Sequence, residues 1–358
     1  MNQVIHVITT IAYGGAENQL KVLVREQIRC GIQVEIFYLK DHPDLKKSFE
    51  SFGAVVNSSL AGQNPLLQFL KLKKKLKSFD GIVHAHLPRA ELISALATTK
   101  KNLIVSKHNT ERFFPSAPKV VSRLLSKFVE KRSCSIVAIS NAVLDFLIES
   151  GEVSSSSKIR VIHYGFDTDF KVKENFSKEI NENFIVGTVA RLTEQKDIQT
   201  LIHAFKYFHQ SVPNSRLHIV GTGKLLYKLK KLVQYLKLEQ SVLWVGRTNN
   251  VAIQLNQMDL FVLPSKYEGF GLVLLEAIQS GVPVVAARNS AIIEVIGSDS
   301  EGLFMTGNSI DLFHKLRDFH DFDNRRKLIK SQEMRLKLFD PSLMCMRVSQ
   351  LYSEVHNE

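Results

Sequence analysis

Short apolar runs that alternate with amphipathic segments constrain the fold of this 358-residue chain more than any other feature. Five such runs in the first half of the chain lie at 3–8, 34–39, 81–86, 103–106 and 136–140. Most segments between them carry apolar residues at helical spacing, as Leu20, Leu23 and Val24 do. Strands that are apolar throughout are typical of a parallel sheet covered by helices on both faces, so the pattern predicts a doubly wound α/β domain.

The same alternation starts again after a polar stretch at 170–183. Five further apolar runs lie at 184–189, 216–220, 242–245, 260–263 and 282–285. The length of the chain also suits two domains. We therefore predict two Rossmann-like doubly wound domains, at residues 1–169 and 184–340, joined by a linker. Ligands of such sheets bind at the carboxyl ends of the strands, which is where site residues are expected.

The charge of the chain is strongly basic, with 47 Lys and Arg residues against 35 Asp and Glu residues and a net charge of +12. The excess lies mainly before residue 170, where 23 basic residues face 15 acidic ones. A basic half is consistent with an anionic partner, which could be nucleic acid, a phospholipid surface or a phosphorylated substrate. A solvated basic face that only keeps the protein in solution explains the excess equally well. No nucleic-acid-binding motif accompanies the charge, so we expect no nucleic-acid partner.

Cysteine content and hydropathy indicate the compartment. The three cysteines, Cys30, Cys134 and Cys345, are too few and too scattered for a disulfide framework or a zinc site. We find no run of 18 apolar residues, and the first residues do not read as a secretory leader. A cytoplasmic protein is therefore expected.

The motif most informative about function is Glu268-Gly269-Phe270-Gly271-Leu272, followed by Glu276, and it comes directly after the predicted strand at 260–263. The two glycines allow a ligand to approach the backbone closely, and the apolar residues after them begin a helix. The N–H groups at the start of that helix suit a phosphate. The two carboxylates could hold hydroxyl groups of one sugar nucleotide at separate points.

This motif resembles the signature of the retaining glycosyltransferases of family 4, in which seven residues separate two glutamates and Gly-Phe-Gly follows the first. The resemblance extends over most of the chain and implies the GT-B fold, with two Rossmann-like domains facing across a cleft. It also implies that a C-terminal helix at about 341–358 packs back on the first domain. The implied reaction transfers a sugar from a nucleotide sugar, UDP-linked, to a glycan or polyprenyl-diphosphate-linked acceptor in cell-surface polysaccharide biosynthesis.

The resemblance also assigns roles to individual residues. It implies that Glu268 binds hydroxyls of the donor sugar and that Glu276 binds the ribose. Arg191 and Lys196 would clamp the donor diphosphate, and His108 would donate a hydrogen bond to the sugar near its reacting end. The remaining donor-binding positions that it implies are Gly14, Gly15, Gly221, Gly223, Gly269, Phe270, Gly271 and Leu272. Because the basic pair neutralises the leaving diphosphate, no metal or other cofactor is expected.

Two features fit the resemblance less simply. His84 and His86 end a predicted strand with a spacing that could bind metal, but we identify no third ligand of matching context, so they are interpreted as acceptor-side or structural residues. After the strand at 282–285, family members usually have a Gly-Gly turn, whereas this chain has 288–291, Arg-Asn-Ser-Ala. Because this segment is expected to border the donor site, the identity of the donor sugar stays open.

Two basic amphipathic segments suggest docking on an anionic membrane. One is the lysine cluster at 71–77, and the other runs from Pro118 to Arg132 with an apolar face. Phe113 and Phe114 could insert between lipids beside it, which predicts a peripheral enzyme on the inner face of the cell membrane. Two helices that pack their apolar faces on the core and solvate their basic faces are the alternative.

Two other functional classes remain open at the level of sequence. A nicotinamide-dependent enzyme could use two α/β domains, but the Gly-x-Gly-x-x-Gly fingerprint is absent. A non-catalytic module of the same fold that binds nucleotide sugars or membranes would carry similar site residues, so only turnover distinguishes it from an enzyme.

Overall fold

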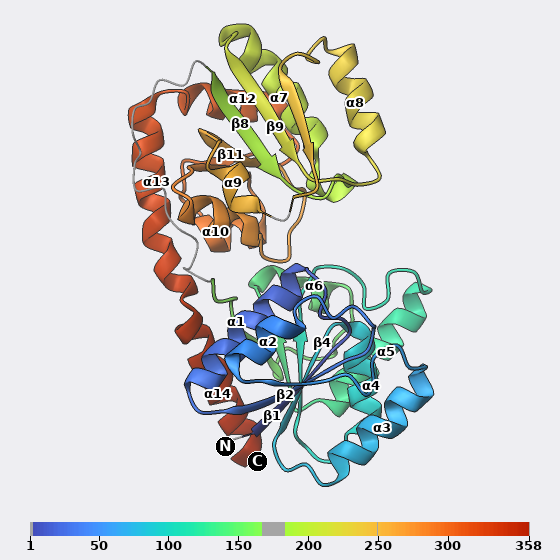
Figure 1. Ribbon diagram of the computed structural model, residues 1–358. Helices are drawn as coiled ribbons and strands as arrows, with labels where there is room; N and C mark the ends of the chain where they lie inside the picture. Colours follow the sequence, from blue (N-terminus) through green and yellow to red (C-terminus); the bar gives the residue numbers. More distant parts are fainter. Residues whose placement is uncertain (1–2, 167–182, 249, 358) are drawn as a thin grey trace. The chain divides into compact units, whose positions relative to one another are not determined.

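The computed structural model describes residues 3–166, 183–248 and 250–357 (Figure 1). Two compact units are present, one made of Met1–Asp167 with Phe339–Glu358 and the other of Thr168–Leu338. Most of the predicted linker, 170–182, lies outside the described residues. Each unit is a parallel α/β sheet with helices on both faces, which confirms the predicted fold class.

Unit 1 contains a seven-stranded parallel sheet in the order β3-β2-β1-β4-β5-β6-β7. Its strands are β1 (Gln3–Ile8), β2 (Gln33–Tyr38), β3 (Val55–Asn57), β4 (Ile82–His86), β5 (Leu103–Lys107), β6 (Ser135–Ala138) and β7 (Ile159–Val161). Its helices are α1 (Gly15–Arg29), α2 (Lys46–Phe52), α3 (Pro65–Lys77), α4 (Pro88–Ala97), α5 (Lys119–Arg132), α6 (Asn141–Glu149) and α14 (Pro341–Asn357). Helix α1 contacts α2 and α14 on one face of the sheet, and α4 contacts α3 and α5 on the other (Figure 1).

Unit 2 contains a six-stranded parallel sheet in the order β10-β9-β8-β11-β12-β13. Its strands are β8 (Phe184–Val189), β9 (Ser215–Val220), β10 (Val242–Gly246), β11 (Leu260–Leu263), β12 (Val284–Ala287) and β13 (Leu303–Phe304). Its helices are α7 (Ile198–Ser211), α8 (Leu226–Tyr235), α9 (Val251–Leu255), α10 (Leu272–Gln279), α11 (Ser290–Ile296), α12 (Ser309–Asp318) and α13 (Phe322–Leu336), with 3₁₀ turns at Glu194–Lys196 and Lys337–Phe339.

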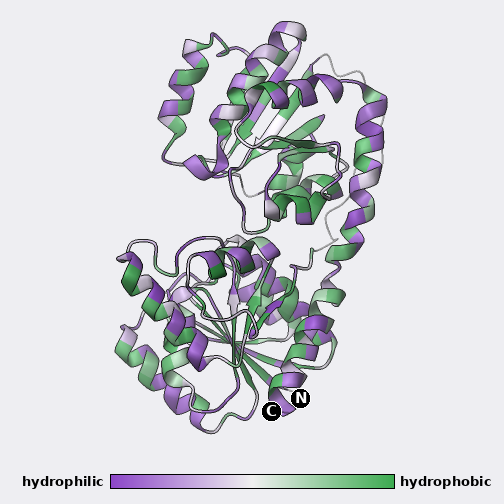
Figure 2. Ribbon diagram, turned by 180° about the vertical axis from the view of Figure 1, so that it is seen from behind, coloured by the Kyte–Doolittle hydropathy of each residue, from purple (hydrophilic) through white to green (hydrophobic). Residues whose placement is uncertain are grey.

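The strands of both sheets are apolar, whereas the helices alternate between hydrophilic and hydrophobic residues (Figure 2). This pattern explains why the ten longer strands could be predicted. The apolar pattern does not reveal β3, β7 and β13, which have two or three residues and lie at the ends of their sheets. A strand this short gives no periodic signal, because pairing with its neighbour rather than its own pattern defines it. Among the described residues, no helix is both long enough and apolar enough to cross a bilayer.

Candidate functional site

The carboxyl ends of the central strands are the expected binding edges of both sheets. In unit 2, β8 lies between β9 and β11, so the chain leaves the middle of the sheet in opposite directions. In unit 1, β1 lies between β2 and β4 in the same way. Such switch points open a crevice between loops where ligands of doubly wound sheets bind. The predicted site residues lie in or next to these loops.

Lys196 and Glu268 form an ion pair at the switch point of unit 2. Lys196 Nζ lies 2.5 Å from Glu268 Oε1, and the two side chains are only 14% and 7% exposed. Two further hydrogen bonds join the same loops: the Lys266 backbone N–H donates to the Gln195 carbonyl (2.8 Å), and the Gln195 side-chain amide donates to the Tyr267 carbonyl (3.0 Å). The fold thus brings together two predicted site residues that are far apart in sequence.

Arg191 follows β8 and is exposed to solvent. The Gly-x-Gly segment after β9 supports its loop, because the Leu192 N–H donates to the Thr222 carbonyl (3.0 Å). Gly221 has a φ of +128°, and a Cβ there would collide with the Ala190 carbonyl oxygen. Gly221 and Gly223 therefore have a structural reason to be glycine: they let two backbones pack closely and fix the Arg191 loop. Their expected contact with the nucleotide stays a prediction.

The Gly-Phe-Gly segment leads into α10. Phe270 is buried, Gly269 and Leu272 are half-buried, and Gly271 is the N-cap of the helix. Glu276 lies on α10, and burial raises its pKa to about 7. A carboxyl group buried in this way is costly to ionise, and hydroxyl donors from a ligand would offset that cost.

The segment that departs from the family pattern is fixed by Asn289. Its side chain accepts a hydrogen bond from the Ile292 N–H and caps α11, and it donates to the Ser265 carbonyl at 3.0 Å. It thereby connects the loop after β12 to the loop that carries Glu268. Arg288 beside it is exposed and donates to the Ser298 carbonyl.

Gly14 and Gly15 lie after β1, where Gly14 is the N-cap of α1 and Gly15 its first residue. The Glu17 carboxylate folds back over Gly14, into space that a side chain there would occupy. Burial raises the pKa of Glu17. The start of α1 is thus covered by a carboxylate of its own helix, a contact that the glycine motif alone did not reveal.

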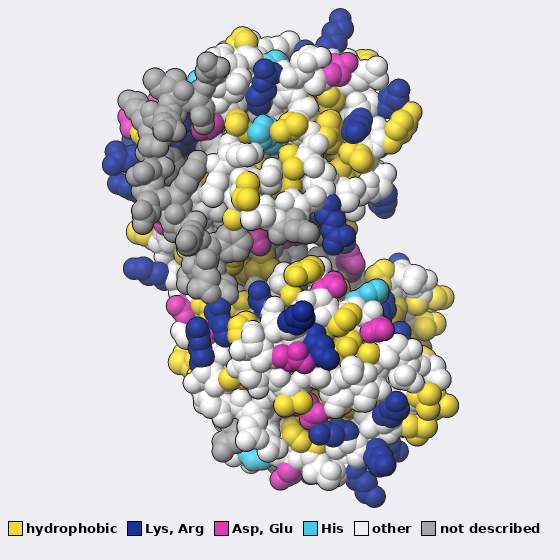
Figure 3. Space-filling view, viewed as in Figure 1, with side chains coloured by type: hydrophobic (Ala, Val, Ile, Leu, Met, Phe, Trp, Pro, Cys, Tyr) yellow, Lys and Arg dark blue, Asp and Glu magenta, His cyan; other side chains and the backbone are white. Residues whose placement is uncertain are grey.

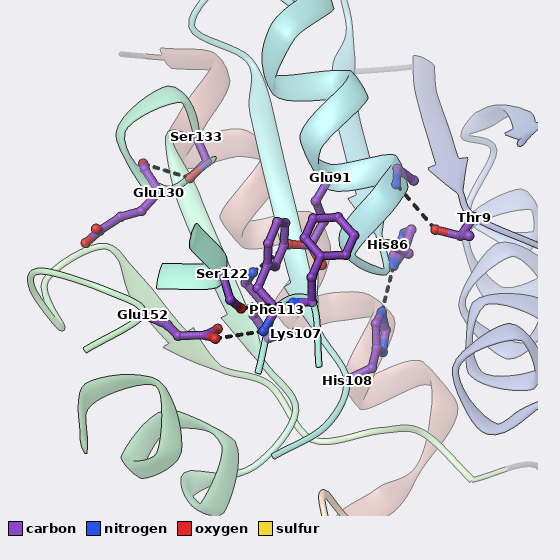
Figure 4. Close-up of polar contacts among 12 residues, drawn as sticks. Thr9, His86, Glu91, Lys107, His108, Phe113, Ser122, Glu130, Ser133 and Glu152 are labelled. Atoms are coloured by element: carbon purple, nitrogen blue, oxygen red, sulfur yellow. Dashed lines mark hydrogen bonds and ion pairs between the residues drawn. The ribbon is translucent and has the colours of Figure 1, made fainter. Parts of the chain in front are cut away.

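His108 follows β5, and both of its ring nitrogens make hydrogen bonds within unit 1. Its Nε2 lies 3.2 Å from His86 Nδ1 (Figure 4), and its Nδ1 lies 2.5 Å from the Tyr164 hydroxyl. Burial, together with the charge of Lys107, lowers the pKa of His108 to about 3. A hydrogen bond from this ring to a sugar therefore requires one of the two partners to be released.

The absence of a third histidine near His84 and His86 was wrongly predicted. His6 on β1 lies opposite His84 in the parallel register, and one ring nitrogen from each of the three falls within a 4.8 Å cluster. His6 stands alone in its segment, so spacing along the chain gives no signal for it. Aligning β1 with β4 as neighbouring strands would have found it.

The predicted insertion of Phe113 into lipid is also wrong. Phe113 is 2% exposed, and Lys107 Nζ lies 4.2 Å from its ring centroid. Lys107 in turn pairs with Glu91 at 2.6 Å, and the Phe113 N–H donates to Glu152 at 2.7 Å. Figure 4 shows these groups packed together. The polar neighbours of Phe113 in sequence suggested exposure, but a buried ion pair from two other elements covers its ring.

Two family models match consecutive parts of the chain. The model described as Glycosyltransferase Family 4 matches residues 13–170, and the model described as Glycosyl transferases group 1 matches residues 169–332. Together they cover almost all of both units. The two matches meet at residues 169–170, where the polar stretch 170–183 begins.

Curated relatives at low identity include enzymes named for sugar transfer. An Escherichia coli UDP-Gal:alpha-D-GlcNAc-diphosphoundecaprenol alpha-1,3-galactosyltransferase is 28% identical over 72% of this chain and 70% of its own length. A Campylobacter jejuni N-acetylgalactosamine-N,N'-diacetylbacillosaminyl-diphospho-undecaprenol 4-alpha-N-acetylgalactosaminyltransferase is 26% identical over 93% of this chain and 94% of its own. The alpha-monoglucosyldiacylglycerol synthase of Acholeplasma laidlawii is 22% identical over 90% of this chain and 89% of its own.

Solved structures share the fold along the whole chain. HepE from Anabaena, solved with UDP, has a TM-score of 0.82 at 21% identity and covers 99% of this chain and 100% of its own. The lipopolysaccharide outer core galactosyltransferase WaaB has a TM-score of 0.71 at 16% identity, over 98% and 99% of the two chains. The chain therefore belongs to glycosyltransferase family 4 and is a retaining enzyme of the GT-B fold that uses a nucleotide sugar.

Proposed function

We propose that this enzyme transfers a hexosyl group from a UDP-sugar to a polyprenyl-diphosphate-linked glycan during cell-surface polysaccharide biosynthesis. The observation that carries the proposal is the ion pair of Lys196 and Glu268 beside the exposed Arg191, at the switch point of unit 2. Two cationic groups there suit a diphosphate, and a carboxylate suits the hydroxyls of the attached sugar. Two relatives whose names specify diphosphoundecaprenol-linked acceptors support the acceptor class.

The residues proposed for the reaction have two roles: some stabilise the charge of the leaving diphosphate, and others orient the donor. Arg191, Lys196 and the N–H groups at the start of α10 would stabilise the negative charge that grows on the leaving diphosphate. Glu268 would orient the donor sugar, and Glu276 would accept hydrogen bonds from the ribose hydroxyls. His108 would form a hydrogen bond with the substrate near the reacting carbon. This arrangement needs no metal, since cationic side chains neutralise the leaving group.

A transfer assay tests this proposal. Purified enzyme is incubated with a panel of UDP-, GDP- and dTDP-sugars and a short-chain polyprenyl-diphosphate N-acetylglucosamine, with and without EDTA. We expect a glycosylated lipid product with at least one UDP-sugar and no loss of activity in EDTA. Transfer only to water-soluble glycans would contradict the acceptor class, and activity that EDTA abolishes and Mg²⁺ restores would contradict the metal-free mechanism.

We further propose that α5 docks on an anionic bilayer. Several of its apolar side chains point outward: Val120 is 68% exposed and Leu124 is 62% exposed, with Lys119 and Lys131 exposed on the same helix. Ser122 and Ser126 face the core instead. Apolar side chains flanked by cations match the chemistry of a bilayer that contains anionic lipids.

The same face of the sheet carries a second basic helix, α3, in which Leu66 and Leu70 are exposed. Figure 3 shows hydrophobic side chains among Lys and Arg on the side of unit 1 that holds α3 and α5. Lys75 of this helix pairs with Glu35 at 2.8 Å, so it is a poorer candidate for lipid contact than the sequence suggested.

Sedimentation with anionic vesicles should fall as salt rises, because charges are screened beyond about 10 Å at 0.1 M. Binding that salt does not change, or no binding at low salt, would contradict docking.

A further inference from the structure

A run of hydrogen bonds leads from His108 into the core of unit 1. His108 Nε2 lies 3.2 Å from His86 Nδ1, and His86 Nε2 lies 3.0 Å from His6 Nδ1. His6 Nε2 then lies 2.9 Å from Gln27 Oε1. His6, His86 and Gln27 are each at most 2% exposed. Their elements are β1, β4 and α1, so the core itself fixes the run.

The run continues at both ends. Four more hydrogen bonds join Tyr164 to His108 (2.5 Å), Gln27 to Tyr352 (3.2 Å), Tyr352 to His84 (2.6 Å) and His84 to Ser106 (2.7 Å). Residues from five strands and helices therefore share one network, including Tyr352 on α14.

The direction of every bond in this run follows from Gln27. Burial lowers the pKa of His6 to about 4, that of His108 to about 3 and that of His86 well below its usual value, so all three rings are neutral at pH 7. A neutral imidazole has one donor and one acceptor nitrogen. The Oε1 of Gln27 only accepts, so His6 carries its proton on Nε2 and accepts on Nδ1.

The protonation of His6 in turn determines which ring nitrogens of His86 and His108 carry a proton. His86 must donate from Nε2 to His6 and accept on Nδ1, so His108 donates from Nε2 to His86. The remaining nitrogen, His108 Nδ1, accepts from the Tyr164 hydroxyl. Turning the Gln27 amide over would reverse every one of these bonds. Gln27 therefore selects which nitrogen of His108 is protonated, although the hydrogen bonds between them pass through His6 and His86.

The histidine cluster could also be considered as a metal site, but its contacts favour hydrogen bonding. Each ring nitrogen of His6, His84 and His86 already bonds to a protein group. A metal would break several of these bonds. Among the described residues, the cluster includes no carboxylate that would offset a divalent charge.

We propose that Gln27, His6 and His86 are positioning residues for sugar transfer, which hold His108 as the Nε2–H tautomer with Nδ1 as its acceptor. This inference rests on the proposed place of His108 at the reaction centre. In that tautomer His108 accepts a hydrogen bond from a substrate hydroxyl, in exchange for Tyr164, instead of donating one. Polarised hydrogen bonds behind the ring make Nδ1 a stronger acceptor.

The test combines spectroscopy with kinetics. Two-dimensional ¹H–¹⁵N spectra of histidine-labelled protein distinguish the protonated ring nitrogen from the bare one, and His108→Gln assigns the signal. We expect Nε2–H at His108 in the wild type. Gln27→Leu should mix the two tautomers and lower kcat about tenfold, with the donor KM changed less than twofold. Gln27→Glu keeps an oxygen acceptor for His6 and should restore both the tautomer and kcat.

Gln68→Leu provides the matched control. Gln68 is another fully buried glutamine of unit 1, bonded to the Leu39 and Leu60 carbonyls and outside the run. The Gln68→Leu variant should be less stable than wild type, but its His108 tautomer and its kcat should be unchanged. An Nδ1–H signal at His108 in the wild type would overturn the proposal, and so would an unchanged kcat in Gln27→Leu. The wild-type spectrum shows the tautomer of His108 even if the enzyme turns over no donor. Failure of this inference can therefore be distinguished from failure of the proposed function.

Discussion

At the scale of single residues, the buried ion pair of Lys196 and Glu268 affects how the donor can bind. Each side chain is placed where the donor is expected to bind, yet each satisfies the other in this structure. A diphosphate and a sugar would therefore compete with an existing contact. Arg191, in contrast, is exposed, and its charge is available without breaking an ion pair of this kind.

This difference predicts distinct outcomes for two substitutions. Arg191→Ala should leave the unfolding midpoint unchanged while lowering kcat about 100-fold, because a transition-state charge loses its partner. Lys196→Ala should also lower kcat, and in addition should destabilise unit 2 by about 3 kcal/mol, because Glu268 is left buried and unpaired. Thermal unfolding and steady-state kinetics measure both effects. Equal stability losses in the two variants would contradict the pairing.

Glu276 predicts a pH dependence of donor affinity. Its pKa is raised to about 7, so the carboxylate that would accept the ribose hydroxyls is mostly protonated at pH 6 and mostly ionised at pH 8. If only the ionised form binds, affinity for a UDP-sugar should rise about tenfold from pH 6 to pH 8. Calorimetry at several pH values measures this change. Glu276→Gln should bind weakly with a flat profile, and a rise that persists in it would assign the effect elsewhere.

The sequence indicates candidate site residues by their spacing, but it does not indicate which side chains they contact. Glu268 and Glu276 have a recognisable spacing, and the strand ends place them at a binding edge. The pairing of Lys196 with Glu268 depends on two strands that become neighbours only in the folded sheet. The contact of His6 with His86 depends on register in the same way. Such contacts belong to tertiary structure, so a motif search cannot find them.

At the scale of elements, the apolar spacing of α5 predicts an amphipathic helix but does not specify what its apolar side chains contact. The apolar spacing of the helix was visible in the sequence and suited packing on the core. In the structure, Val129 and two serines face inward, whereas Val120 and Leu124 face solvent. A hydrophobic stripe indicates that something covers it but does not identify what does.

The exposed stripe predicts a specific loss of membrane binding. The double variant Val120→Ser/Leu124→Ser should bind anionic vesicles at least about 100-fold more weakly than wild type in sedimentation, since about 2 kcal/mol of apolar transfer is lost for each well-inserted side chain. Its unfolding midpoint should not fall, because both residues are exposed. Tyr235→Ser, at an 83% exposed site on α8, is the matched control and should bind as wild type does. Equal binding by all three proteins would show that α5 does not enter lipid.

At the scale of the whole molecule, the C-terminal helix belongs to the first unit. Helix α14 buries Met344, Val348, Leu351 and Tyr352 in a core cluster that also contains Val4 and Ile82. The chain thus passes through unit 2 and returns. Packing between segments so far apart in sequence could be expected only from the family resemblance, because nothing in the amphipathic pattern of 341–358 specifies which unit it covers.

This arrangement predicts how the two units unfold. Leu351→Ala should destabilise unit 1 by about 2–5 kcal/mol, the usual range for removing a large buried side chain. Unit 2 should unfold at its wild-type temperature, because Leu351 packs in the core cluster of unit 1 described above. Met346→Ala, on the same helix but 60% exposed, should change neither transition. Calorimetry resolves the two transitions, and a shift of both by Leu351→Ala would mean that they are coupled.

The return of the chain to unit 1 also sets the order of events during synthesis on the ribosome. The Phe166 N–H donates to the Phe339 carbonyl, so roughly 170 residues are translated between these partners. At 5–20 residues per second, the ribosome needs roughly ten to forty seconds after the last strand of the first sheet to translate α14. During that interval the surface later covered by α14 is bare in the nascent chain. Chaperones that recognise apolar segments would bind this surface in the nascent chain. The surface can be covered only after the ribosome has translated α14.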